Sequence, residues 1–347
     1  MSNHVAINPA LLTWARERAG VDAFVLEGRF PKLAAWEVGE LQPTLKQLED
    51  FAHAVHVPIG YLFLPEPVQE TLPVADFRTV PGQTAPRSSP DLLDALYLCQ
   101  QRQDWYRDYA RLNAFPALEF IGCTTVTNDP VAAASAMRHS LGLSLTERQQ
   151  LPNWEEALRQ LIAKIEEAGV LVMVSSIVGS NSHRKLRVEE FRGFALADDL
   201  APLVFINGAD SKAAQMFTLA HELAHLWLGE SGISNTEAGR LPEQRTELWC
   251  NAVAAELLMP MQATREAYRS DQPLADEITR LARLFKVSTL VALRRLFDAG
   301  FIDKTELWQQ YREEVTRLRN FSQRSSGGAI STVPLAHAPA SVSHKPC

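Results

Sequence analysis

The sequence has few cysteines, and none is placed to form a pair. Four cysteines are scattered along 347 residues, and no two of them form a C-x-x-C motif. Disulfide frameworks and cysteine-type zinc sites both depend on closely spaced cysteines, so neither is expected here. Isolated cysteines fit a reducing compartment.

Signals for membranes or export are also missing. No apolar run approaches the about 20 residues that a membrane-spanning helix needs. The first ten residues lack the charged-then-apolar order of a signal peptide. We therefore expect a cytoplasmic protein without a membrane partner.

The chain has no surplus of positive charge. Its formal net charge is −7, which argues against a protein coated in nucleic acid along its length but leaves room for a small DNA-reading module. A hydrophobic share of 46% and a charged share of 22% are ordinary for globular proteins, and 347 residues suffice for two or three domains.

Hydrophobic periodicity divides the chain into a helical start, a mixed centre and a helical end. The start and the centre are joined by a proline-rich connector and a helix, and a tail of Ser, Ala, Pro and Gly that has little to bury is predicted to be disordered. In order, the predicted parts are 1–65, 66–120, 121–270, 271–322 and 323–347.

The mixed centre predicts a fold of the α+β class. Apolar runs at 170–174, 191–197 and 203–206 indicate strands, whereas 211–228 and 244–258 have helical spacing. In the helical end, an amphipathic helix pair that caps this core is favoured over a second helix-turn-helix.

The helix predicted at 211–228 carries the chemistry. His221 and His225 are four residues apart, which places both imidazoles on one helix face. Two nitrogen donors held in this way suit tetrahedral zinc. Glu222 is one position on, where it can take a proton from water at the metal without binding the metal itself.

The same three residues could instead lie on a solvated helix face. Their neighbours argue against this, because the helix is apolar on most sides and is therefore expected to be buried. Buried histidines and carboxylates need partners. These neighbours are Phe217, Leu219, Ala220, Leu223, Ala224, Leu226, Trp227 and Leu228.

A catalytic zinc also needs a third protein ligand. The position six residues after His225 is Ser231, so the extended metzincin pattern is absent. A glutamate on a following helix is the other common solution. The candidates are Glu230, Glu237, Glu243, Glu247 and Glu256.

Glu247 is the preferred candidate. It opens an apolar helix that Pro260 ends, and Asn251 lies four residues later on the same face. Asn251 is thereby placed to accept the free ring N–H of a zinc-bound histidine. The alternative is a surface glutamate near a helix start, where its charge suits the helix dipole.

These motifs resemble the ImmA/IrrE family of metallopeptidases. The resemblance rests on His221-Glu222-Leu223-Ala224-His225, Glu247-x-x-x-Asn251, Leu257-Leu258-Met259-Pro260, Phe217-Thr218-Leu219-Ala220 and Asp76-Phe77-Arg78-Thr79. It implies a zincin-like core, with His221, His225 and Glu247 as zinc ligands and Glu222 as the base. It also implies a regulatory endopeptidase that cleaves a partner protein, a transcription repressor. Cys250, where many members have Ala, is a small departure.

Residues 1–65 resemble a helix-turn-helix module of the XRE type, with Pro31–Trp36 as its candidate recognition helix. DNA affinity rests largely on neutralised phosphates. The segment holds five Lys or Arg against seven Asp or Glu, and only Arg29 and Lys32 lie near that helix. A substrate-docking or dimerising unit, and with it a homodimer, is the alternative.

Two functions therefore stand against each other. The first is a zinc endopeptidase. The second is a DNA-binding transcriptional regulator or antitoxin-like protein whose peptidase fold serves for sensing or binding. The intact Glu222 favours the first, because a binding module has no need of a base. For the oxyanion, His183 and Tyr268 are candidates by residue type alone.

Overall fold

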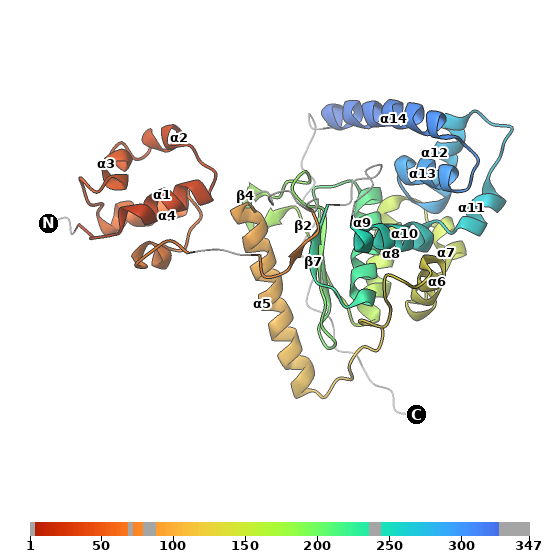
Figure 1. Cartoon of the computed structure of the whole chain (residues 1–347), viewed down its shortest axis with the longest axis horizontal. Helices are drawn as coiled ribbons and strands as arrows, with labels where there is room; N and C mark the ends of the chain where they lie inside the picture. The colour runs from red at the N-terminus through yellow and green to blue at the C-terminus, as the bar shows by residue number, and fades with distance from the viewer. Residues whose placement is uncertain (1–3, 69–71, 79–87, 236–243, 326–347) are drawn as a thin grey trace.

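A computed structural model describes residues 4–68, 72–78, 88–235 and 244–325 (Figure 1). Most of the tail predicted at 323–347 therefore lies outside the described residues. None of the described helices is both long and apolar enough to cross a membrane.

Short helices form the N-terminal unit, as the sequence predicts. Asn8 and Thr44 cap the first and last of its α-helices, where their side chains accept backbone N–H groups. The elements are α1 (Pro9–Arg18), α2 (Ala23–Glu27), α3 (Leu33–Glu37), α4 (Leu45–Ala54) and the 3-10 helix η1 (Ile59–Phe63). They enclose their own buried cluster, which includes Leu11, Leu12, Trp36, Leu48 and Phe51. Because α2 and α3 have only five residues each, the helix-turn-helix assignment stays a prediction.

The centre of the chain is a five-stranded sheet in the order β1-β7-β5-β6-β2. Strand β5 runs antiparallel to β6 and β7, whereas β2 is parallel to β6 and β1 is parallel to β7. The strands are β1 (Ala75–Asp76), β2 (Leu171–Ser175), β5 (Gly193–Leu196), β6 (Leu203–Asn207) and β7 (Gly232–Ser234). A separate hairpin pairs β3 (Ile177–Val178) with β4 (Asn181–Lys185).

Both faces of this sheet are covered, because its central strands are apolar on both sides. Phe194 and Leu203 belong to one buried cluster, while Ala195 and Val204 belong to the other. This follows from the two-residue period of a strand. Helix α5 (Pro90–Leu112) covers the first face, and α8 (Trp154–Glu167), α9 (Lys212–Leu228) and α10 (Arg245–Leu258) lie on the second (Figure 1).

The remaining helices extend the second layer. Leu281, Phe285 and Leu296 are buried in the same cluster as α9 and α10, which supports the predicted capping pair. The elements are α6 (Pro130–Ser140), α7 (Leu145–Gln150), α11 (Met261–Ala267), α12 (Leu274–Phe285), α13 (Thr289–Asp298) and α14 (Lys304–Ser325).

The α+β class expected from the sequence is confirmed, and the predicted strands at 170–174, 191–197 and 203–206 correspond to β2, β5 and β6. Two short strands add to them. Strand β1 comes from the proline-rich connector and occupies one edge of the sheet, and β7 lies between β1 and β5. The connector is thus part of the same sheet on which α9 packs.

Candidate metal centre

Helix α9 carries the two histidines at the centre of the molecule. The Ser211 hydroxyl accepts the N–H of Ala214 at its start, and Gly229 ends it with a φ of +71°. Only glycine suits that end, since a Cβ at Gly229 would lie 3.0 Å from the Cα of Gly122. The close approach of these two backbones fixes where the helix stops, one turn beyond His225.

His221, His225 and Glu247 converge on one point. The Nε2 atoms of the two histidines are 3.1 Å apart. Glu247 places Oε1 at 2.9 Å from the Nε2 of His225 and Oε2 at 3.3 Å from the Nε2 of His221. Both imidazoles are completely buried and Glu247 is 3% exposed. Two nitrogens and a carboxylate therefore share a small, dry volume.

This donor set fits a tetrahedral metal ion. With metal–ligand bonds of about 2.0–2.1 Å, the edges of a tetrahedron measure about 3.3 Å, close to the separations between these atoms. A search of the described residues for three or more His, Cys, Asp or Glu side chains that could hold one metal ion finds this cluster. The predicted third ligand, Glu247, lies with the two predicted histidines.

The protonation states suit metal binding. Burial lowers the pKa of His225, which favours the neutral imidazole that a ligand must be. Burial opposes ionisation of Glu247, but the two histidines outweigh it and lower the pKa of its carboxyl from 4.5 to about 2. The site therefore holds a carboxylate ready to bind a cation.

Asn251 lies where the sequence places it, behind His221. Its Oδ1 is 3.0 Å from Nδ1 of His221, on the side of the ring that faces away from Glu247. When the amide oxygen accepts the Nδ1–H, the Nε2 lone pair is left for the metal. Helix α10 thus supplies both Glu247, which contacts the two histidines, and Asn251, which contacts the far side of the His221 ring.

Glu222 is buried beside this cluster without a hydrogen-bond partner of its own. Neither of its carboxylate oxygens has a partner in hydrogen-bonding geometry among the described residues. Burial raises the pKa of Glu222 well above 4.5, the charge of Glu247 adds to this, and the nearby Ser234 hydroxyl offsets it only in part. A carboxylate of this kind is a proton acceptor poised at higher pH than an ordinary glutamate.

Gly193 makes the space that Glu222 occupies. A Cβ at Gly193 would lie 2.6 Å from Cγ2 of Thr218 and 3.0 Å from Oε1 of Glu222. Gly193 also pairs in register with Ser234, whose hydroxyl oxygen is 3.4 Å from Nε2 of His225. The strands β5 and β7 therefore form the wall of the site opposite α9.

The other residues considered at the sequence level lie elsewhere. Glu256 pairs with Arg295, and Glu230 follows α9 outside the cluster. Glu237 and Glu243 lie outside the described residues. Of the oxyanion candidates, His183 is exposed on β4, and Tyr268 stacks on Phe301 with ring centroids 4.0 Å apart. No described contact joins either of them to the cluster.

Three residues of the site were not predicted as parts of it: Phe77, Gly193 and Ser234. The Phe77 ring stacks on His225, with centroids 5.0 Å apart and planes 13° apart. The only signal for it was its place in the matched Asp76–Thr79 segment. Gly193 and Ser234 reach the site through strand pairing, for which the sequence carries no local signal.

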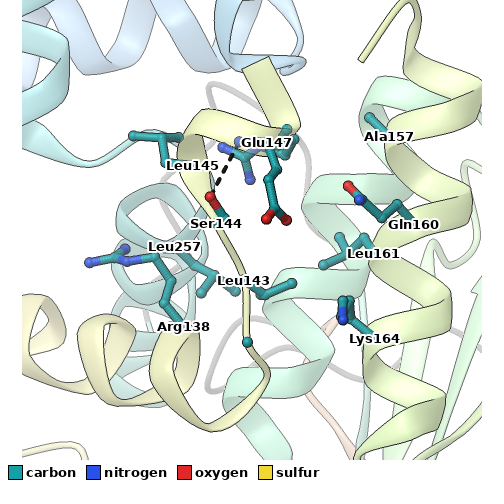
Figure 2. Close-up of a pocket in the computed structure, with 12 residues that line it drawn as sticks. Arg138, Leu143, Ser144, Leu145, Glu147, Ala157, Gln160, Leu161, Lys164 and Leu257 are labelled. Atoms are coloured by element: carbon teal, nitrogen blue, oxygen red, sulfur yellow. Dashed lines mark hydrogen bonds between the residues drawn. The ribbon is translucent and has the colours of Figure 1, made fainter. Parts of the chain in front are cut away.

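A separate pocket lies between α8 and the segment that joins α6 to α7, with an empty volume of about 420 Å³ that is partly open to solvent. The carboxylate of Glu147 and the amide of Gln160 point into it (Figure 2). Its arginines serve α10, because Arg138 donates to the carbonyl of Glu256 at 2.8 Å and Arg148 donates to that of Leu258. None of the residues in the His221, His225 and Glu247 cluster lines this pocket. Its arginines hold the carboxyl end of α10 and do not contact the cluster.

Comparison with known proteins finds similarity to metallopeptidases. Residues 165–297 match the model of the peptidase M78 family, described as the IrrE N-terminal-like domain. The radiation response metalloprotease IrrE of Deinococcus radiodurans is 35% identical over 101 residues, which are 28% of this chain and 31% of that protein. The protein of the same name from Deinococcus deserti is also 35% identical over 101 residues, 28% of this chain and 36% of its own length.

The matched part spans about a third of the length of these relatives. The range matched by the family model, residues 165–297, includes all three residues of the cluster together with Glu222 and Asn251. Residues 165–297 therefore form a domain that is similar to the IrrE N-terminal-like domain of the peptidase M78 family.

Proposed function

We propose that the chain is a zinc-dependent endopeptidase that hydrolyses a peptide bond in a partner protein. One observation carries this proposal: two imidazoles and a carboxylate converge within hydrogen-bonding distance, beside the buried Glu222, whose carboxylate has no hydrogen-bond partner in the part of the chain that the structure describes. A binding site for a metal alone would not require that glutamate. A hydrolytic site requires it as the base.

The residues divide the work as follows. His221, His225 and Glu247 hold the zinc ion, which acts as a Lewis acid toward water and the substrate carbonyl when bound. Glu222 accepts a proton from the attacking water and passes it to the leaving amine. Its burial and raised pKa suit both steps, because the same group must take up and release a proton near neutral pH. Asn251 keeps His221 in the required tautomer.

The substrate we propose is a transcription repressor, and the activity is regulatory. The two Deinococcus relatives are named radiation response metalloproteases, a name that ties their activity to a cellular response. A single deeply buried base and a separate N-terminal helical unit fit a selective protease with its own recognition surface.

Zinc content and cleavage test the proposal together. The full chain is purified, its metal is quantified, and it is incubated with purified transcription repressors from the same organism. We expect about one zinc per chain and one dominant cleavage, which Glu222→Gln abolishes while zinc is retained. Absence of zinc from the wild type, or equal cleavage by Glu222→Gln, overturns the proposal.

Glu230→Gln is the matched control for this experiment. Glu230 follows α9 and is half-buried, but its carboxylate is not among the clustered ligands. Its loss is expected to leave both zinc content and cleavage near the wild-type level. A Glu230→Gln variant without zinc would reassign the third ligand.

The alternative function is that of a transcriptional regulator that binds DNA through residues 1–65. In the structure, Leu33 and Trp36 of α3 are buried, and Lys32 is an exposed cation at its start. This function predicts tight, sequence-specific and salt-dependent DNA binding that weakens in Arg29→Ala and Lys32→Ala, together with no proteolysis. Mobility shifts at two salt concentrations therefore separate the two functions.

A further inference from the structure

The two histidines of the cluster are oriented in different ways. His221 has the amide oxygen of Asn251 at its Nδ1. The corresponding atom of His225, its Nδ1, is buried and has no hydrogen-bond partner among the described residues. Metal-binding histidines nearly always have such a partner, which fixes the ring and its tautomer. Something else must hold the His225 ring.

The aromatic ring of Phe77 lies flat against that histidine. The two ring centroids are 5.0 Å apart, and the planes differ by only 13°. A stacked ring blocks rotation of the imidazole out of its plane, which is the motion that would move Nε2 away from Glu247. The stack therefore restrains the same degree of freedom that a hydrogen bond to Nδ1 would restrain.

We propose that Phe77 is a positioning residue for the metal ligand His225, doing through ring stacking what Asn251 does for His221 through a hydrogen bond. This inference rests on the proposed function, because it takes His225 to be a ligand. It assigns a role to the Asp76-Phe77-Arg78 segment, which the peptidase chemistry itself does not use.

The backbone of this segment is fixed to the site from the sheet side. Strand β1 pairs with β7 so that Ala75 faces Gly232 and Asp76 faces Ile233. The N–H of Phe77 then donates to the carbonyl of Ile233 at 3.0 Å. Upstream, Leu72 and Val74 pack against the buried cluster on the α5 face of the sheet. Phe77 is thus anchored to the strand that follows the metal-site helix.

The chain after Phe77 is fixed by a half-buried ionic network. The guanidinium of Arg78 donates to both oxygens of Asp76, at 2.8 and 2.7 Å, and lies 3.8 Å from Glu190. The Arg78 side chain is only 4% exposed. Glu190 in turn accepts the hydroxyl of Ser89 at 2.7 Å, at the start of α5. With both flanks held, the Phe77 ring has little freedom to leave His225.

The absence of a side chain at Gly232 leaves the space that the Phe77 ring occupies. A Cβ at Gly232 would lie 2.1 Å from Cε2 of Phe77, a distance that no side chain tolerates. Gly232 has no positive φ, so the requirement comes from the neighbouring ring and not from the backbone. The sheet edge is therefore shaped to admit an aromatic side chain over His225.

Metal binding of the full-length chain, measured apart from activity, tests this role. Zinc dissociation constants are determined by competition with a chromogenic chelator for wild type, Phe77→Ala, Phe77→Leu and Phe77→Tyr. We expect about tenfold weaker zinc binding for Ala and Leu, the lower end of the range for loss of an orienting partner. Tyr, which keeps the ring, is expected to stay near the wild type.

The visible spectrum of the cobalt-substituted protein gives a second readout that a structural role would not move. Loss of the stack is expected to change the band pattern in Phe77→Leu, because the His225 ring is freed to tilt. Phe77→Leu keeps most of the apolar volume. It therefore still tests whether the stacked ring orients His225 if Phe77→Ala does not fold.

Phe120→Leu is the matched control. Phe120 stacks on Trp227, two residues after His225 on the same helix, with centroids 4.3 Å apart. Its replacement removes an equivalent stack from α9 without touching a ligand, so zinc affinity and the cobalt spectrum are expected to be unchanged. An equal loss in Phe120→Leu overturns the inference, since the effect would then be general to the helix.

The outcomes also separate this inference from the proposed function. A wild type that binds no zinc removes the proposed function itself. A wild type that binds zinc, with unchanged affinity and spectrum in Phe77→Ala and Phe77→Leu, overturns only the role of Phe77.

Discussion

The Nδ1 atom of His221 lies 3.0 Å from the Oδ1 atom of Asn251, which is supplied by the next helix of the core. The same helix brings Glu247 to both histidines. Helices α9 and α10 therefore form the candidate metal centre as a pair, and a shift of α10 relative to α9 would move Glu247 and Asn251 together away from the histidines.

Replacing Asn251 by Ala is expected to weaken zinc binding about 10- to 100-fold, the range found when the orienting partner of a ligand histidine is lost. Asn251→Asp keeps an acceptor oxygen at the same place and is expected to retain most of the affinity. Chelator competition on the folded variants measures both. Wild-type affinity in Asn251→Ala would show that His221 needs no orienting partner.

The buried Glu222 makes a prediction about pH in the metal-free protein. Its pKa in the folded state is raised, chiefly by burial, so the folded state holds the proton more tightly than the unfolded chain. Stability from this group is therefore full below about pH 4.5 and falls as pH rises above it. The Glu222→Gln variant cannot ionise at this position, so its stability does not fall with pH for this reason.

We accordingly expect metal-free Glu222→Gln to be more stable than the wild type by at least about 1 kcal/mol at pH 8, and the two to be nearly equal at about pH 4. Urea unfolding in the presence of a chelator at both pH values measures the difference. A gap of the same size at both pH values would mean that ionisation of Glu222 is not its source.

Gly193→Ala is expected to lower stability by about 1–3 kcal/mol, the usual cost of an overpacked core. The new methyl group would meet Thr218 at 2.6 Å and the carbonyl of Phe205 at 2.9 Å, and it would press on Glu222 at 3.0 Å. Gly28→Ala is the control, because nothing lies within 4 Å of a Cβ there and its φ is negative. Thermal melts that fall equally for both would refute the steric explanation.

The parts of the site that could be predicted from the sequence are those set by helical spacing. His221 and His225 share a face of α9 because four residues make about one turn, and Glu247 and Asn251 share a face of α10 for the same reason. Such relationships are local. The choice of Glu247 among five glutamates rested on the apolar helix that it opens and on Asn251, which lies four residues later on the same face.

The parts that could not be predicted depend on strand pairing between distant segments. Phe77 reaches His225 only because β1 pairs with β7, and β1 has two residues while β7 has three. Strands this short show no alternation of apolar and polar residues. Gly193 lies on the predicted strand β5, but its place in the site depends on the register between β5 and the short strand β7, which carries Ser234.

The C-terminal helices are predicted to be integral to the peptidase core through one buried ion pair. Arg295 of α13 pairs with Glu256 near the end of α10, and both side chains are at most 7% exposed. The Nε of Arg295 also donates to the carbonyl of Met259 at 2.9 Å, while Glu256 accepts the N–H of Met261. The guanidinium of Arg295 thus binds two groups at the carboxyl end of α10, the helix that carries Glu247.

Arg295→Ala is expected to cost about 3–5 kcal/mol, because it leaves the Glu256 carboxylate buried without its cation. The neighbouring Arg294 is the matched control, since it pairs with Asp298 at 2.9 Å on an exposed helix face. Exposed pairs contribute about 0–1 kcal/mol, so Arg294→Ala should unfold nearly as the wild type does. Denaturant midpoints of the two variants decide the matter: if they fall by the same amount, the buried pair does not bind α13 to the core.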